Sequence, residues 1–258
     1  MSKRMFPAVT AAACMVALCG ATAANAATTT SVGVSGFYLT GKYGHSKSTD
    51  IYYVPLTFRL YSGDFGFSVS LPYLSKTGPT NVLPNIGSVG TGSGTTSTRS
   101  GMGDVRLTGT YRVWNDPANG VAVTLGAKVK LGTASYANGL GTGKNDYALQ
   151  AALSRSSGPL YLALTGGYRK QGSPAGLKLR NVAYGQADII YRISKANSLG
   201  LSTFYTQASL ATGTDRLLST AYFSHRIGRS WTSTAFLMKG YTRSSPDYGG
   251  GLSIRYTF

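Results

Sequence analysis

Residues 50–75 have the sequence DIYYVPLTFRLYSGDFGFSVSLPYLS, in which two alternating segments flank the turn formers Ser62-Gly63-Asp64. Successive side chains of an extended strand point to opposite faces. One face of residues 50–62 therefore carries Tyr52, Val54, Leu56, Phe58 and Leu60. The same face of residues 65–75 carries Phe65, Phe67, Val69, Leu71 and Tyr73. Strands of globular proteins have a typical length of about 5–6 residues, whereas a strand that crosses a bilayer needs about 9–11. Both segments are long enough to cross a membrane.

The remainder of the chain continues this pattern. Short, turn-rich connections such as NDPANG and SSGP alternate with longer ones, of which residues 76–101 are the longest. Outer-membrane barrels have an even number of antiparallel strands, short periplasmic turns and long outer loops. A secreted β-sandwich, the alternative, predicts shorter strands and no alternation of loop length. The sequence thus predicts an all-β fold, a transmembrane antiparallel β-barrel of about 12 strands with both termini on the periplasmic side. The predicted strands are 33–43, 50–62, 65–75, 102–114, 119–132, 144–156, 159–171, 180–194, 197–209, 215–228, 230–243 and 246–258.

The first residues resemble an export signal. Lys3 and Arg4 precede an apolar stretch that ends at Ala24-Asn25-Ala26, an A-x-A-like cleavage site. We therefore expect residues 1–26 to be a signal peptide and residues 27–258 to be a single barrel domain. Both cysteines, Cys14 and Cys19, lie in the leader. The predicted location is the outer membrane of a Gram-negative bacterium.

The composition supports β structure over helix. The chain has 34 Gly and 18 Tyr, and its eight acidic residues are all Asp. Long helices favour Glu, Lys, Ala and Leu. No stretch after the leader has 18 consecutive apolar residues, so we expect no transmembrane helix.

Charge determines which face of each strand points inward. A Lys or Arg that faces lipid at mid-depth costs about 2–4 kcal/mol, so the bulky apolar positions should face lipid and the opposite positions should line a basic lumen. We expect Arg59, Arg112, Arg192, Arg226 and Arg255 near the periplasmic end, and Arg106, Lys128, Lys130 and Arg169 nearer the outside. The acids of the same phase are Asp104, Asp146 and, near mid-strand, Asp188. Two interpretations remain open. The cations attract anionic solutes, or they pair with acids, backbone carbonyls or a folded-in loop and only solvate the interior.

Aromatic residues near strand ends predict girdles at the two membrane interfaces. Tyr161, Tyr184 and Tyr222 are inward candidates that could line an aromatic path. The girdle residues are Tyr38, Tyr43, Tyr52, Tyr53, Tyr73, Tyr147, Tyr241, Tyr256 and Trp231.

The last strand, GLSIRYTF at 251–258, alternates strictly and must pair with the first strand, because an unpaired edge cannot exist in hydrocarbon. Its pattern resembles the signal by which the bacterial barrel-assembly machinery recognises its clients. That resemblance implies that Tyr256 and Phe258 form an assembly signal and that the machinery is a partner.

Other chemistry is not expected. GLGTGKN at 139–145 lacks the first Gly, the Ser or Thr and the helix of a phosphate loop. Two histidines, His45 and His225, are too few for a zinc site, so we predict no metal and no cofactor. Ser224 and His225 are adjacent and point to opposite faces, which argues against catalysis. Nucleic acid is not an expected partner of an exported barrel.

Three stretches resemble a known family: GMGDVRLTGTYRVW (101–114), VTLGAKVKLGTA (123–134) and GLGTGKNDYALQAALS (139–154). They are similar to the outer-membrane transporter family associated with the MetA pathway of phenol degradation. Gly132-Thr133-Ala134 stands where that family usually has Pro-Thr-Gly. The resemblance implies an outer-membrane barrel that moves small molecules such as aromatic compounds. The matching positions are Gly101, Gly103, Asp104, Tyr111, Arg112, Lys130, Leu131, Gly141, Gly143, Asp146 and Tyr147.

The leading hypothesis is a monomeric barrel, surrounded by outer-membrane lipid and lipopolysaccharide, through which small solutes diffuse. Aromatic acids satisfy both the resemblance and the charge, with selection by the basic lumen and the loop at 76–101. The alternatives are an acidic-oligosaccharide porin, a non-conducting structural or adhesive surface barrel, and a lipid enzyme.

Overall fold

The computed structural model describes residues 28–89 and 95–258. The predicted signal peptide, residues 1–26, lies outside the described residues. So does residue 27, the first residue of the predicted barrel domain. No helix in the described part is long and apolar enough to cross a membrane. The strands are β1 (Thr29–Gly41), β2 (Thr49–Ser62), β3 (Phe65–Pro79), β4 (Val82–Leu83), β5 (Gly87–Ser88), β6 (Thr96–Met102), β7 (Val105–Asp116), β8 (Val121–Leu131), β9 (Asp146–Ser157), β10 (Leu160–Lys170), β11 (Val182–Arg192), β12 (Asn197–Thr206), β13 (Arg216–Ile227), β14 (Trp231–Gly240) and β15 (Tyr248–Thr257).

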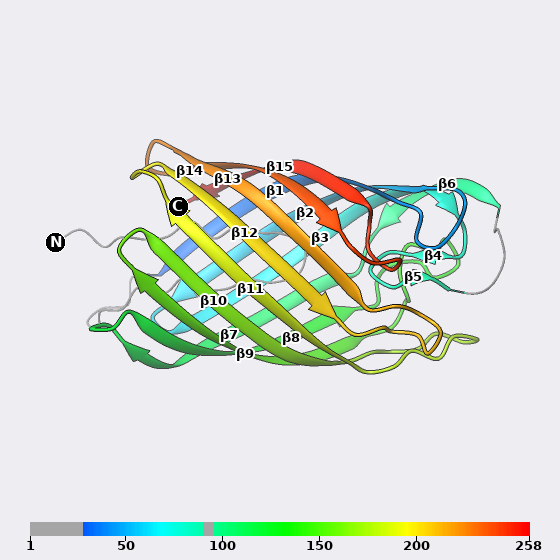
Figure 1. Ribbon diagram of the computed structural model, residues 1–258, viewed down its shortest axis with the longest axis horizontal. Coiled ribbons are helices and arrows are strands. Elements are labelled where there is room, and N and C mark those ends of the chain that lie inside the picture. The colour runs from blue at the N-terminus through cyan, green and yellow to red at the C-terminus, as the bar shows by residue number, and fades with distance from the viewer. Residues whose placement is uncertain (1–27, 90–94) are drawn as a thin grey trace.

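The strands form a closed antiparallel barrel (Figure 1). Each wall strand pairs with its neighbours in sequence, and β1 closes the ring by pairing with β15. β6 and β7 both pair with β3 and together act as one wall strand, interrupted at Gly103-Asp104. The short β4–β5 hairpin stands apart from the wall. The wall therefore has 12 strands, and the predicted fold class is confirmed.

The two ends of the barrel differ as the loop lengths predicted. The short turns lie at one end together with the start of β1 and the end of β15, and the long loops lie at the other (Figure 1). In outer-membrane barrels the short turns are periplasmic and the long loops are extracellular. We call the first the inner end and the second the outer end.

The outer surface is apolar around the whole circumference. Every wall strand carries at least one large hydrophobic side chain that is exposed, such as Leu149 on β9 and Leu237 on β14. A water-soluble sandwich would bury these residues in its core. The side chains predicted to face lipid, including Leu252, Ile254 and Phe258 of β15, are among the exposed ones. Small polar residues such as Ser68, Thr165 and Thr220 are buried on the opposite face.

The predicted bounds were wrong at the long hairpin. β3 continues to Pro79 and β6 begins at Thr96, so the paired strands extend well beyond the predicted ends at 75 and 102. In this extension Lys76 faces Arg99 and Thr77 faces Thr98. With polar residues on both faces, the alternation that identifies a membrane strand is absent. The rest of the predicted loop at 76–101 contains β4 and β5, and residues 90–94 lie outside the described residues.

The closing strand is held by aromatic contacts as well as by backbone pairing. The backbone N–H of Phe258 donates to the carbonyl of Thr30 at 3.1 Å. The ring of Tyr256 packs edge-on against Trp231 and against Phe258, with centroid separations of 4.9 and 5.0 Å. These contacts connect β15 to β14 and extend the β1–β15 seam to the inner end.

We expect Phe258→Ala to lower the fraction of chains that assemble in the outer membrane, because it removes the last aromatic ring of the seam and of the predicted assembly signal. Assembly can be measured as the fraction of outer-membrane protein that migrates in the compact form on unheated gels. Phe223→Ala removes another lipid-facing aromatic residue, on β13, and is the matched control. Equal assembly of the two variants would contradict the role of Phe258.

Candidate functional site: the lumen

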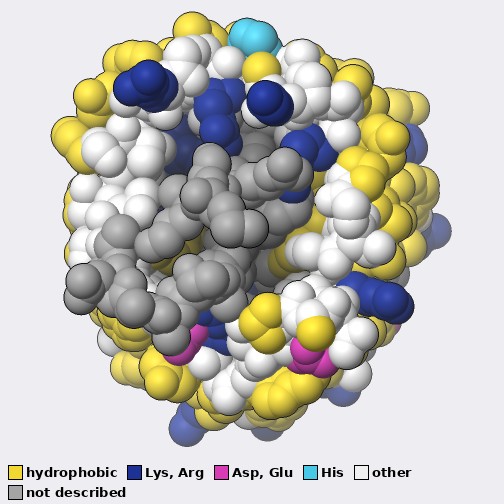
Figure 2. Space-filling view, turned by 90° about the vertical axis from the view of Figure 1, so that its left-hand side faces the viewer, with side chains coloured by type: hydrophobic (Ala, Val, Ile, Leu, Met, Phe, Trp, Pro, Cys, Tyr) yellow, Lys and Arg dark blue, Asp and Glu magenta, His cyan; other side chains and the backbone are white. Residues whose placement is uncertain are grey.

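Arginines surround the inner end of the lumen. Arg226 of β13 and Arg255 of β15 both face Thr232 of the intervening strand β14. Arg59 of β2 lies close enough for its charge to act on Arg255. Viewed from this end, Lys and Arg side chains gather around the mouth (Figure 2). Arg192 ends β11 on the same inward phase, opposite the buried Ser198.

Arg112 pairs with an acidic side chain at the inner end. Its Nε donates to Oδ1 of Asp64 at 2.7 Å, and its Nη2 forms an ion pair with the same carboxylate. Asp64 lies in the β2–β3 turn, and the sequence analysis did not consider it as a partner. Arg112 is therefore held at the wall by a neighbouring turn.

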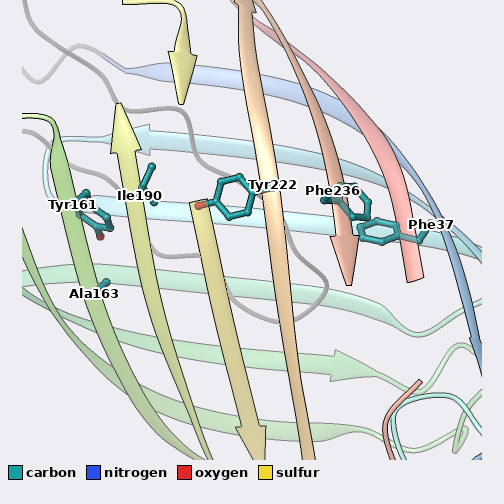
Figure 3. Packing of buried hydrophobic residues seen from close by; sticks show 6 residues of the cluster. All are labelled: Phe37, Tyr161, Ala163, Ile190, Tyr222 and Phe236. Carbon is teal, nitrogen blue, oxygen red and sulfur yellow. The ribbon is translucent and has the colours of Figure 1, made fainter. Parts of the chain in front are cut away.

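An aromatic and apolar cluster lies in the middle of the lumen. Phe37, Tyr161, Ala163, Ile190, Tyr222 and Phe236 form a buried cluster on the inner face of the wall (Figure 3). We call this cluster, with the adjoining Tyr53, the aromatic layer. The rings of Phe37 and Phe236 lie 4.6 Å apart between centroids, and those of Phe37 and Tyr53 lie 5.8 Å apart. The predicted basic residues of the lumen are therefore separated at mid-depth by a cluster of inward aromatic and aliphatic residues, which includes the inward candidates Tyr161 and Tyr222.

Glycines let the aromatic side chains lie along the wall. Tyr222 of β13 is paired with Gly200 of β12, and a Cβ atom on Gly200 would overlap the tyrosine ring. Tyr184 over Gly167 and Phe236 over Gly251 repeat the arrangement on other strand pairs. A side chain at these glycines would force each ring away from the wall and into the lumen.

Asp188 also lies at mid-depth, and an amide holds it. Both oxygens of its carboxylate accept hydrogen bonds from Nε2 of Gln186, at 2.8 and 2.9 Å. Within residues 28–89 and 95–258, no ion pair involves Asp188. In these contacts Asp188 binds the amide of Gln186 and not an arginine of the lumen.

A cavity of about 240 Å³ occupies the outer half of the lumen, and we call it the outer chamber. Its floor includes Tyr184, Phe204, Leu218 and Met238, four apolar or aromatic side chains that belong to one buried cluster. Five cations from four strands line it: Arg106 of β7, Lys128 and Lys130 of β8, Arg169 of β10 and Arg216 of β13.

Two of these cations lie near aromatic rings. The guanidinium carbon of Arg106 is 5.9 Å from the centroid of the Tyr53 ring, and Nζ of Lys128 is 5.4 Å from that of Tyr184. Distances within about 6 Å are typical of cation–π attraction. The outer chamber therefore combines positive charge and aromatic surface in one space.

Arg216 was missed by the sequence analysis. It has the same parity along β13 as the inward Tyr222 and the predicted lumen residue Arg226, so alternation alone could have identified it. However, Arg216 is the first residue of the strand, and Leu217 and Leu218 after it are both apolar, so the alternation is not visible at that end. Its Nη1 donates to the backbone carbonyl of Asn85 at 2.9 Å. Arg216 thereby connects the wall to the β4–β5 hairpin that covers the outer chamber.

The cover of the outer chamber is built from two loops. Pro84, Asn85 and Ile86 of the β4–β5 hairpin line it, and so does Tyr43 of the β1–β2 loop. Nε2 of His45 is 2.9 Å from Oγ of Ser88, which joins the two loops. Burial raises the pKa of the Tyr43 phenol to about 12, so this side chain stays protonated and adds no negative charge to the chamber.

Tyr43 and Tyr53 correct the predicted girdles. Tyr43 is buried under the loops, and Tyr53 packs against the apolar clusters of the lumen. Adjacent residues of a strand point to opposite faces, so Tyr52 and Tyr53 cannot both face lipid. Tyr52 is the exposed one of the pair. Tyr161, Tyr184 and Tyr222 do point inward, and all three are buried.

Lys130 lies in a charge network at the wall of the outer chamber. Its Nζ is 3.0 Å from Oδ2 of Asp104 and 3.1 Å from Oδ2 of Asp146, and it donates to Oγ1 of Thr142 at 2.9 Å. The three partners come from the β6–β7 junction, the start of β9 and the β8–β9 loop. We call these four residues the Lys130 network. It places two carboxylates of the lumen on one lysine.

The motifs that carried the family resemblance meet at this network. Asp104, Lys130 and Asp146 belong to the three separate motifs and form its ion pairs. Gly141 leaves room for Asp104, since a Cβ atom there would lie 2.9 Å from Oδ2 of Asp104. Oγ1 of Thr133 donates to the carbonyl of Gly103 at 2.8 Å. Gly103, Asp104, Lys130, Gly141 and Asp146 of the motifs thus join β6, β7, β8 and β9 at the outer end.

The β8–β9 loop is folded inward by this network. Ala134 and Leu140 of the loop are buried against Leu74 of β3, with Tyr53 packed beside them. The loop therefore narrows the outer end of the lumen. A phosphate-loop function for residues 139–145 has no support, because no helix follows them.

Metal binding and a Ser–His pair can both be examined in the described part of the chain. No group of three or more His, Cys, Asp or Glu there could hold a metal ion. Oγ of Ser224 is hydrogen-bonded inside the barrel to Oγ1 of Thr234 at 2.8 Å, whereas the neighbouring His225 is exposed and contacts Asn197. The two side chains lie on opposite faces and do not form a nucleophile–base pair.

A closed 12-stranded barrel with an apolar belt and an inward face of polar and aromatic residues defines an outer-membrane channel. The sequence profile of the family described as "Putative MetA-pathway of phenol degradation" matches residues 21–228, and the chain belongs to this family. The predicted family resemblance is thereby confirmed. Among curated proteins, none matches the chain in sequence.

Solved structures show the same fold. The crystal structure of an outer membrane channel from Pseudomonas putida F1 matches with a TM-score of 0.67 and 16% identity, covering 92% of this chain and 97% of that chain. A KdgM porin matches with a TM-score of 0.53 and 12% identity, covering 88% and 99%. The same porin in complex with disordered oligogalacturonate matches at 0.54.

We expect Lys130→Met to lower the free energy of unfolding by about 3–5 kcal/mol, because it leaves two mostly buried carboxylates without their cation. Denaturant unfolding of the refolded barrel measures this. The triple variant K130M/D104N/D146N removes the charges together and should recover part of the loss. A single variant as stable as the wild type would show that the network does not hold the outer end together.

We expect Gly200→Val to reduce single-channel conductance, because the new side chain pushes the Tyr222 ring into the lumen. Overpacking of this kind also costs about 1–3 kcal/mol of stability. Gly166→Val is the matched control, since a Cβ atom on Gly166 meets nothing within 4 Å. Unchanged conductance in the Gly200 variant would mean that the aromatic layer does not limit the passage.

Proposed function

We propose that this channel lets small aromatic anions, such as aromatic carboxylates and sulfonates, diffuse across the outer membrane through a lumen that is basic at both ends. The observation that carries the proposal is the outer chamber, where Arg106, Lys128, Arg169 and Arg216 surround an aromatic and apolar floor. A solute with both a negative charge and a ring has a partner there for each part.

The distribution of charge supports this solute class. Two groups of inward cations lie along the axis, near the inner end and in the outer chamber, and like charges in a low-dielectric passage focus potential. Three of the lumen carboxylates, those of Asp64, Asp104 and Asp146, are paired with Arg112 and Lys130. The remaining positive charge favours entry of anions over cations.

The aromatic layer sets a second requirement for the solute, in addition to negative charge. A solute that passes Phe37, Tyr222 and Phe236 loses water along part of its surface, which is costly for polar groups that find no new hydrogen bonds. Removing water from an aromatic ring costs little free energy, and the ring gains contact with the aromatic side chains of the wall. Aromatic anions therefore satisfy both parts of the lumen.

An acidic oligosaccharide fits this lumen less well. Sugars carry hydroxyl groups along their whole length, and hydroxyl groups that pass against the two apolar clusters would find no hydrogen-bond partner in those side chains. The structural similarity to the KdgM porin is at 12% identity and concerns the fold. We propose no enzymatic activity, because Ser224 and His225 are on opposite faces. Lipid around a monomer accounts for the continuous apolar belt.

We expect the reconstituted channel to conduct benzenesulfonate several-fold faster than benzyltrimethylammonium, since both keep their charge at all working pH values and differ mainly in its sign. Uptake into liposomes measures the two rates. The double variant R106Q/R169Q should lose most of the preference, whereas R243Q, at an exposed loop residue outside the lumen, should keep it.

Two outcomes would refute the proposal. Rates no higher than those of protein-free liposomes would indicate a non-conducting surface barrel. Equal rates for the two ions in the wild type would show that the lumen charge does not select solutes.

A further inference from the structure

We propose that the outer chamber is a saturable binding site for a single aromatic carboxylate, held through its carboxylate by Arg216 with Arg106 and Arg169 and through its ring by the apolar floor. This inference deepens the proposed function and rests on it. It predicts that solutes stop at a defined station in the channel and bind there one at a time.

The three guanidinium groups converge from separate parts of the wall. Arg106, Arg169 and Arg216 lie on β7, β10 and β13 and all line the cavity. The charges of Arg106 and Arg169 both act on Arg216, so each of them is close enough to repel the Arg216 guanidinium. An anion between them would replace this repulsion by attraction, and guanidinium groups bind carboxylates through two parallel hydrogen bonds.

Arg216 has donor capacity that the protein does not use. Nη1 donates to the carbonyl of Asn85, while Nε is buried and has no hydrogen-bond partner among residues 28–89 and 95–258. Buried donors are nearly always paired in native proteins, and an unpaired one at a cavity calls for an explanation. Among the described residues Arg216 also forms no ion pair with an acid, so a ligand carboxylate in the chamber would give this guanidinium an anionic partner.

The acids that line the chamber do not serve as the partner of Arg216. Asp104 and Asp146 line the cavity, but Lys130 lies within 3.1 Å of both and holds them at the β7–β9 side. Asp146 also accepts a hydrogen bond from the backbone N–H of Gly172, and Asp104 accepts one from that of Ala134. Both carboxylates that line the cavity are thus held by other partners.

The size and floor of the chamber select the ring. Its volume of about 240 Å³ lies below the roughly 300–1,000 Å³ of pockets for drug-sized ligands, which favours a solute with one ring. Phe204, Leu218 and Met238 give that ring an apolar surface on the side facing the aromatic layer. A methionine and an aromatic side chain are both favourable neighbours for an aromatic ligand.

Backbone strain is concentrated in the cover of the same chamber. Tyr43 (φ 50°) and Asn85 (φ 66°) are the two non-glycine residues with positive φ in the described part of the chain, and both line the cavity. Such conformations cost of order 1–3 kcal/mol each and are found preferentially at ligand clamps and active sites. Here Tyr43 places its phenol over the chamber, and Asn85 places there the carbonyl that accepts the hydrogen bond from Arg216.

The test is equilibrium binding to the full-length barrel in detergent, measured by isothermal titration calorimetry. We expect benzoate to bind saturably to one site, at least about tenfold tighter than benzyl alcohol, which lacks the charge, and acetate, which lacks the ring. Equal affinities of benzoate and acetate would overturn the role of the floor. Equal affinities of benzoate and benzyl alcohol would overturn the role of the arginines.

Variants assign the site. R216Q should weaken benzoate binding by about tenfold or more, with R169Q as a second variant in case the first does not fold, and both are checked for the compact form on unheated gels. R243Q, an equal loss of charge at an exposed residue of the outer end, should bind as the wild type does. Wild-type affinity in a folded R216Q or R169Q barrel would overturn the assignment.

The binding and flux experiments can fail independently, so they test the binding site and the channel function separately. Saturable benzoate binding without benzenesulfonate flux would refute the proposed channel function and leave the site in place. Flux with a non-saturable benzoate isotherm would refute the site and leave the channel in place.

Discussion

The structure depends on one constraint, the pairing of every backbone N–H and C=O of the wall within the wall. Hydrocarbon offers no hydrogen-bond partner, so a sheet that crosses it must close on itself. β1 and β15 supply that closure along ten paired positions, from Ser31–Thr257 to Thr40–Tyr248. Because the barrel is closed, each strand has a lipid face and a lumen face, and the remaining features of the molecule follow from how those two faces are filled.

The lipid face and the lumen face of the wall have different physical requirements. The lipid face must be apolar at every depth in the membrane, so it is nearly uniform around the ring. The lumen face has no such requirement and varies along the axis, from arginines at the inner end, through the aromatic layer, to the cations of the outer chamber. This variation is possible because the glycines on neighbouring strands accept the large rings, as Gly200 does for Tyr222. A passage with distinct layers thus arises from a wall of regular strands.

The sequence was sufficient for the fold and for the direction of most side chains. Alternation, loop length and the cost of a charge in lipid predicted twelve strands and the inward phase of residues such as Arg106 and Arg255. They could not predict mid-depth layers, because in Phe236-Leu237-Met238 both faces of the strand are apolar and parity cannot be recognised. Contacts between distant segments were also out of reach. The pairing of Arg112 with Asp64 and the inward folding of the β8–β9 loop depend on three-dimensional proximity that no local pattern encodes.

Two lysines on one strand show how the same residue type acquires different roles in this lumen. Lys128 and Lys130 are two positions apart on the inward face of β8, and sequence alone treats them as equivalent. Lys130 lies opposite Asp146 of β9 and within reach of Asp104, so its charge is met by two carboxylates and it stabilises the outer end. Lys128 lies opposite Ala148 and approaches the ring of Tyr184. The field inside the outer chamber is therefore set by where the few acids lie. The Lys130 network holds both acids that line the cavity at one side, and the proposed recognition of an anion depends on the positive charge of the arginines across the chamber.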